Sequence, residues 1–119
     1  MTQYKLGEVE SAFAALIWDN EPLPSSRLVE LCADRLDWKK STTYTVLRRL
    51  CQRGIFQNEG GMVTSLISRE EFAARQTQEF VDQTFEGSLP KFLAAFTTRK
   101  KLNRAEIEQL QRLIDESRR

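Results

Sequence analysis

The stretch D-W-K-K-S-T-T-Y-T-V-L-R-R-L-C-Q-R-G, residues 37–54, decides how the chain is expected to fold. Four of its side chains recur at the i, i+3, i+4, i+7 spacing that forms one buried stripe along an α-helix. These four are Thr43, Val46, Leu47 and Leu50. Gly54 follows them at the position where a glycine commonly ends a helix. The sequence therefore predicts an amphipathic helix that ends at this glycine.

The opposite face of this predicted helix carries hydroxyls and cations. The stretch holds five Lys and Arg residues against one Asp, whereas the whole chain has a net charge of only +1. Such side chains bind phosphates and base edges in the major groove of DNA. A solvated basic face is the alternative interpretation, because short basic amphipathic helices are common. The DNA-binding residues we predict are Lys39, Lys40, Ser41, Thr42, Tyr44, Thr45, Arg48 and Arg49. Of these, Lys39 and Arg49 are expected on flanking phosphates.

Two further helices are expected before this one. Residues 6–19 contain apolar side chains at helical spacing, and the two prolines of residues 20–24 interrupt the pattern. Ser25 or Ser26 would cap a second helix, which a short turn joins to the helix of residues 37–54. Two helices joined in this way are typical of a helix-turn-helix. The apolar side chains of the first helix are Val9, Phe13, Leu16 and Ile17.

A β-hairpin is expected directly after Gly54. Apolar and β-branched residues flank the turn sequence N-E-G-G, residues 58–61. Three helices followed by a hairpin have the order of a winged helix-turn-helix. The tip of this short wing carries Glu59 and no cation, which disfavours a contact with DNA phosphates. We therefore predict a mostly α, α+β fold with a winged helix-turn-helix DNA-binding domain over residues 1–67.

Residues 68–119 are expected to form three amphipathic helices. Ser68, Ser88 and Asn103 each stand where a side chain would cap one of them. Three such short helices have more apolar surface than they can bury among themselves, so we predict that two tails pack together in a homodimer. The alternative is that the tail folds back on its own winged helix. The predicted dimerisation residues are Phe72, Gln76, Phe80, Leu89, Phe92, Leu93, Phe96, Ile107, Leu110 and Ile114.

The composition disfavours other classes of protein. The 119 residues include no histidine, which removes the nucleophile systems that depend on it and the commonest general base. Cys32 and Cys51 fall in apolar helical patterns, as expected of buried, reduced thiols. We predict no enzymatic activity, no metal and no cofactor. The sequence shows no signal segment and no apolar run near the roughly 20 residues of a membrane span, so we expect a cytoplasmic protein without membrane insertion.

Five motifs are distributed along nearly the whole chain. They are L-G-E-V-E at residues 6–10, I-W-D-N-E-P-L at 17–23, D-W-K-K-S-T-T-Y-T-V-L-R-R-L at 37–50, L-I-S-R-E-E-F at 66–72 and G-S-L-P-K-F-L-A-A-F at 87–96. In this order and spacing, they resemble the BlaI/MecI/CopY transcriptional repressors, the penicillinase repressor family. The resemblance implies an N-terminal winged helix and a C-terminal helical dimerisation region. It also implies a homodimer that binds a palindromic operator in double-stranded DNA and represses nearby genes.

The resemblance further implies how such a repressor is released. In one branch of the family, a membrane sensor protease of the BlaR/MecR type responds to β-lactam, and the repressor is cut in its tail. The matching bond in this chain joins Ala95 and Phe96. A cut there would release the last helix and weaken the dimer, which lowers operator affinity because one half-site binds far more weakly than two.

The chain also departs from the family pattern. Lys39 and Lys40 stand where the family usually has a serine and a proline, and the wing is shorter than usual. No cysteine follows Cys51, whereas the copper-responsive branch has paired C-x-C motifs in its tail. An alternative function is a winged-helix module that binds another protein, without specific DNA binding. Residues 1–67 favour it with their acidic wing tip and equal numbers, eight each, of basic and acidic side chains.

Overall fold

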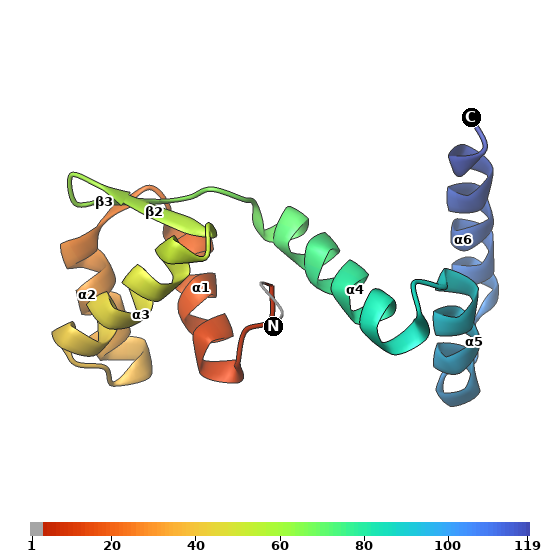
Figure 1. The fold of residues 1–119 in the computed structure, drawn as a ribbon, viewed down its shortest axis with the longest axis horizontal. Coiled ribbons are helices and arrows are strands. Elements are labelled where there is room, and N and C mark those ends of the chain that lie inside the picture. The colour runs from red at the N-terminus through yellow and green to blue at the C-terminus, as the bar shows by residue number, and fades with distance from the viewer. Residues whose placement is uncertain (1–3) are drawn as a thin grey trace. The chain divides into compact units, whose positions relative to one another are not determined.

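The structure is a computed structural model that describes residues 4–119, so the first three residues of the predicted DNA-binding domain lie outside the described part. Figure 1 shows its elements. They are α1 (Glu8–Asn20), β1 (Leu23–Pro24), α2 (Ser25–Leu36), α3 (Lys40–Gln52), β2 (Phe56–Glu59), β3 (Met62–Ser65), α4 (Arg69–Phe85), α5 (Leu89–Arg99) and α6 (Arg104–Ser117). The mostly helical, α+β winged-helix fold is thus confirmed. The chain divides into two compact units, with the boundary between Glu79 and Phe80, within α4.

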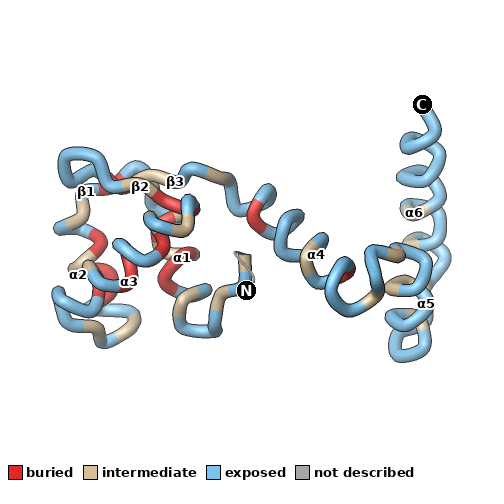
Figure 2. The backbone as a smooth tube through the Cα atoms, viewed as in Figure 1, coloured by how far each residue is buried: buried red, intermediate tan, exposed pale blue. Residues whose placement is uncertain are grey.

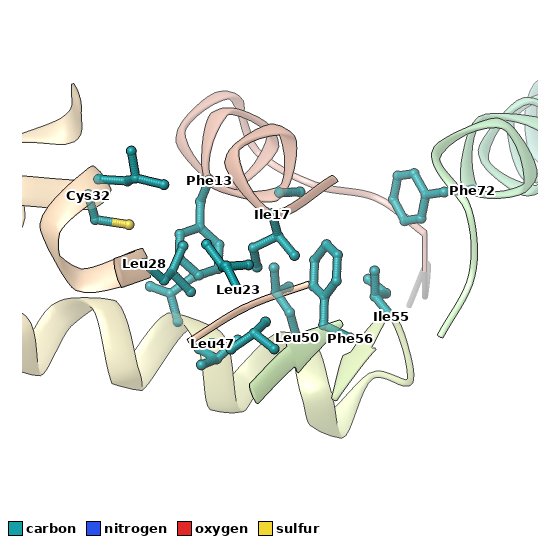
Figure 3. Close-up of a cluster of buried hydrophobic side chains, with 14 residues drawn as sticks. Phe13, Ile17, Leu23, Leu28, Cys32, Leu47, Leu50, Ile55, Phe56 and Phe72 are labelled. Carbon is teal, nitrogen blue, oxygen red and sulfur yellow. The ribbon is translucent and has the colours of Figure 1, made fainter. Parts of the chain in front are cut away.

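Buried residues concentrate in the first unit (Figure 2), where α1, α2, α3 and the sheet enclose one core. All four residues of the predicted α3 stripe are buried, as expected. In α1, Phe13 and Ile17 are completely buried and point into the core (Figure 3). Val9 was assigned to the same stripe, which is wrong: its side chain is 55 % exposed. It lies in the first turn of α1, which begins only after Gly7.

The sheet contains a strand that the sequence did not predict. β3 lies between β1 and β2 and pairs antiparallel with both, with Leu23 opposite Val63. The pattern of residues 20–24 predicted only a break, because prolines are rare in strands. Pro24 is tolerated here because β1 is an edge strand, where a missing N–H costs little. The predicted hairpin is confirmed, and Gly60 and Gly61 both have the positive φ that a two-residue turn of this kind requires.

The helix ends follow local chemistry, with one exception. Ser68, Ser88 and Asn103 accept hydrogen bonds from backbone N–H groups in the first turns of α4, α5 and α6, as predicted. The predicted cap of α2 by Ser25 or Ser26 is wrong. Pro24 occupies the cap position and Ser25 is already the first helical residue. The hydroxyl of Ser25 bonds to another helix instead, as described below.

Gly54 ends α3 in the left-handed conformation, with φ of +79°. We expect Gly54→Ala to lower the free energy of unfolding by about 1–2 kcal/mol, because a side chain in this conformation crowds its own backbone. A Cβ at this position would lie more than 4 Å from every other described residue except its two chain neighbours, so local backbone strain accounts for the loss. Urea denaturation measures the change. Gly7→Ala is the matched control, since a φ of −68° does not strain alanine. Alanine is a poorer N-cap than glycine, but it lowers the entropy of the unfolded chain, so the two effects largely offset each other and the change should stay below about 0.5 kcal/mol. Equal losses in both variants would contradict the assignment.

The start of α4 belongs to the first unit. Phe72 is only 5 % exposed, and its ring lies 5.8 Å from that of Tyr4 and 5.4 Å from that of Trp18. Phe72 was predicted to contact a second chain, but its burial within one chain leaves it little surface for that role. Within residues 4–119, no helix is both long enough and apolar enough to cross a membrane.

Candidate nucleic-acid interface

The exposed face of α3 carries most of the predicted DNA-binding residues. The buried stripe holds α3 against the core, so the other side of the helix faces outward. Lys39 precedes the first helical residue and is exposed. Six further residues are exposed along the helix: Lys40, Ser41, Thr42, Thr45, Arg48 and Arg49. Tyr44 differs because its ring is half-buried against the core.

The cations on this face differ in their surroundings. Arg49 Nη1 lies 3.3 Å from Glu10 Oε2 of α1, so this guanidinium already has a partner. In the described part of the chain, Lys39, Lys40 and Arg48 form no ion pair. Lys39 and Lys40 also stand at the start of α3, and no acidic residue lies in its first turn. The dipole of a helix disfavours cations at this end. The two lysines therefore cost the helix some stability, and functional sites often break a local rule of this kind.

Some of the hydroxyl groups on α3 donate hydrogen bonds to backbone carbonyl oxygens of the same helix. Thr45 Oγ1 donates to the carbonyl oxygen of Ser41 at 2.9 Å. This bond uses its hydrogen and leaves the methyl group and the oxygen lone pairs. A threonine methyl group suits an apolar contact with the methyl group of thymine. Thr45 can therefore make an apolar contact or accept a hydrogen bond, and Ser41 and Thr42 supply the nearby hydroxyls.

The fold brings two residues to this face that sequence reasoning missed. Asn58 of β2 lines a hollow of about 210 Å³ with four α3 residues, among them Tyr44 and Arg48. Ser25 Oγ of α2 lies 3.0 Å from Tyr44 Oη. No local pattern marks either residue, because the partners are distant in the sequence. Cys51 also lines the hollow, and burial raises the pKa of its thiol, so it stays uncharged at neutral pH.

The second unit carries the other predicted surface, which is apolar. Phe80, Phe85, Phe92 and Phe96 form a chain of ring contacts with centroids 5.7–6.3 Å apart. Phe92 and Phe96 also line an open groove of about 280 Å³ between α5 and α6, together with Leu93, Leu110 and Leu113.

Large apolar side chains remain exposed in this unit. Leu89 is 64 % exposed, Ile107 53 %, and Phe80 and Ile114 50 % each. The predicted dimerisation residues thus lie mostly around one open apolar surface, apart from Phe72 and Gln76, which belong to the first unit. Gln76 is exposed on α4.

The predicted cleavage bond lies inside a helix. Ala95 is exposed and Phe96 is 44 % exposed, and both precede the end of α5 at Arg99. The carbonyl oxygen of Phe96 accepts a hydrogen bond from the backbone N–H of Lys100 at 3.1 Å. A protease that binds extended backbone would therefore need the last turn of α5 to open.

Both units match one known protein family. The family model described as "Penicillinase repressor" matches residues 6–116, from before α1 to the last turn of α6. No curated protein gives a significant match. The family match spans all five motifs and confirms the resemblance. The chain therefore belongs to the penicillinase repressor family, whose members repress transcription.

Proposed function

We propose that this protein represses transcription by binding a palindromic operator in double-stranded DNA as a homodimer. The observation that carries the proposal is the exposed face of α3. There Lys39, Lys40 and Arg48 have no acidic partner within the described residues. The exposed hydroxyls of Ser41 and Thr42 lie on the same helix. Cations of this kind supply the sequence-independent affinity for phosphates, and the neighbouring groups can read base edges.

The side chains have different expected roles. Lys39 and Lys40, at the start of α3, are proposed to bind phosphates, with Arg49 added if it leaves Glu10. An exposed surface ion pair such as this one contributes at most about 1 kcal/mol, so exchange for a phosphate costs little. Arg48 is proposed to contact a guanine, whose O6 and N7 accept two hydrogen bonds from one guanidinium. The wing adds little, since Glu59 at its tip repels phosphates.

The homodimer is proposed to form through the apolar surface of residues 80–119. A lone chain would leave this surface in water, which is typical of a protein interface. A two-fold dimer would present two copies of α3 to the two halves of a palindrome. We further propose, on the family resemblance, that a sensor protease cuts Ala95–Phe96 once α5 opens. Loss of α6 would then weaken the dimer and release the operator.

The test is DNA binding by the full chain, with Arg48→Ala as the variant. Duplexes selected from a random pool by the parent protein serve as the DNA. We expect tight binding of a dimer that weakens steeply as salt rises. Arg48→Ala should weaken binding by about 1–3 kcal/mol, roughly 5- to 150-fold, if it contacts a base. Arg104→Ala is the matched control, since it removes the same charge from α6, where the side chain is 94 % exposed.

The outcome also decides between the two candidate functions. A module without specific DNA binding would select no duplex, or its affinity for DNA would not change with salt. The equal numbers of basic and acidic side chains in residues 1–67 favour that alternative. Equal affinities of the parent and Arg48→Ala would instead refute the face assigned to α3, while leaving DNA binding itself intact.

A further inference from the structure

One serine connects the wing and α3. Ser25 is the first residue of α2, and its backbone N–H donates to the carbonyl oxygen of Gly61, in the turn of the wing, at 2.7 Å. Its side-chain hydroxyl lies 3.0 Å from Tyr44 Oη of α3. The backbone hydrogen bond fixes Ser25 against the turn of the wing. The hydrogen bond between the two hydroxyls then fixes the position of Tyr44 Oη relative to Ser25.

Tyr44 is held in one orientation from both ends. Its ring packs against the core and is half-buried, while its hydroxyl meets Ser25. Two hydroxyls that share one hydrogen bond use one of their two hydrogens. Whichever oxygen is the donor, one O–H group and several lone pairs remain in the pair. Serine and tyrosine hydroxyls commonly donate to DNA phosphate oxygens.

We propose that Ser25 is a positioning residue: its O–H donates to Tyr44 Oη and holds the Tyr44 hydroxyl where that group donates its own hydrogen to one phosphate oxygen of the bound DNA. The inference rests on the proposed function and adds to it a residue outside α3. A tyrosine fixed before binding loses less side-chain freedom when it meets DNA, so the contact becomes more favourable. Ser25 thus acts on DNA affinity mainly through Tyr44.

The test is a double-mutant cycle on the full chain, with a duplex selected by the parent. Ser25→Ala and Tyr44→Phe should each weaken binding by about 3- to 10-fold, because each removes the shared hydrogen bond. In the double variant, Ser25→Ala should add nothing to the loss caused by Tyr44→Phe. Ser25→Thr keeps a hydroxyl and should restore most of the affinity. Ser26→Ala is the matched control, since this neighbouring hydroxyl is exposed and lies on the same helix.

A second readout separates a DNA contact from a purely structural role. Duplexes in which single phosphates are replaced by methylphosphonates lose the charge and one acceptor oxygen at a known position. One such position should weaken binding by the parent but not by Tyr44→Phe. The urea midpoint of each variant is measured alongside, so that any unfolded fraction is known.

Four results would overturn the role of Ser25. The first is unchanged affinity in Ser25→Ala, and the second is an equal loss from Ser25→Ala in the Tyr44→Phe background. The third is a loss that the unfolded fraction fully explains, and the fourth is the absence of any phosphate position that distinguishes the parent from Tyr44→Phe. If the parent itself binds no duplex, the proposed function fails as well, so the two failures are distinguishable.

Discussion

Replacing Ile107 and Ile114 together by aspartate is expected to separate the proposed dimer into monomers and to lower operator affinity by about 10²- to 10⁴-fold. The two residues are separated by seven positions on α6, so they share one face of the helix. Both are about half exposed within one chain, so each chain should still fold. A carboxylate buried without a partner in an apolar interface is strongly unfavourable, so the dimer should separate. The large loss follows because a monomer engages only one half of a palindrome.

Sedimentation equilibrium gives the mass of the variant, and titration of the selected duplex gives its affinity. Arg112→Asp is a control matched in charge, because it also changes the net charge of the chain by −2. Arg112 is exposed and lies on the side of α6 opposite the two isoleucines. We expect this control to remain dimeric and to bind DNA much as the parent does. A double variant that stays dimeric would show that this face of α6 is not the interface.

Phe13→Ala is expected to lower the free energy of unfolding by about 3–5 kcal/mol. Phe13 has no exposed surface and points into the core (Figure 3). Its ring stacks on that of Trp38 at a centroid distance of 5.3 Å. Alanine would leave a cavity that the rigid packing of α1, α2 and α3 fills only in part. Domains of this size are stable by only about 5–15 kcal/mol, so the variant should be close to unfolding.

Urea denaturation at one fixed protein concentration measures this loss, because the proposed dimerisation would make stability depend on concentration. Val9→Ala is the matched control on the same helix. Val9 is 55 % exposed, so its truncation should change stability by less than about 0.5 kcal/mol. A small effect of Phe13→Ala, or a large effect of Val9→Ala, would contradict the arrangement of α1 in the core.

Periodicity and capping chemistry predicted most of the elements. The spacing of Thr43, Val46, Leu47 and Leu50 identified the buried side of α3. The opposite side of the helix therefore had to face outward. Spacing alone failed at Val9, because it does not show where a helix begins to touch the core. It also failed at Leu23–Pro24, because a two-residue strand has no periodicity and exists only through its pairing with β3.

The candidate interface divides in the same way. The cations and hydroxyls of α3 could be assigned from sequence, since they follow one another along a single helix. The sequence did not predict that Arg49 would pair with Glu10, because that pair joins residues 39 positions apart. Phe72 was predicted to be a dimerisation residue because it is apolar. In the structure its ring packs against those of Tyr4 and Trp18 of the same chain.

Local sequence patterns were sufficient to establish the winged-helix class, the outward face of α3 and the amphipathic tail. Helical spacing, caps and turns depend only on residues close to one another in the sequence. Contacts between distant segments decided the rest. They placed β1 beside the wing, Asn58 beside Arg48, and Ser25 against both Gly61 and Tyr44. Such contacts depend on how the helices pack around the core, and no spacing along the sequence encodes that packing directly.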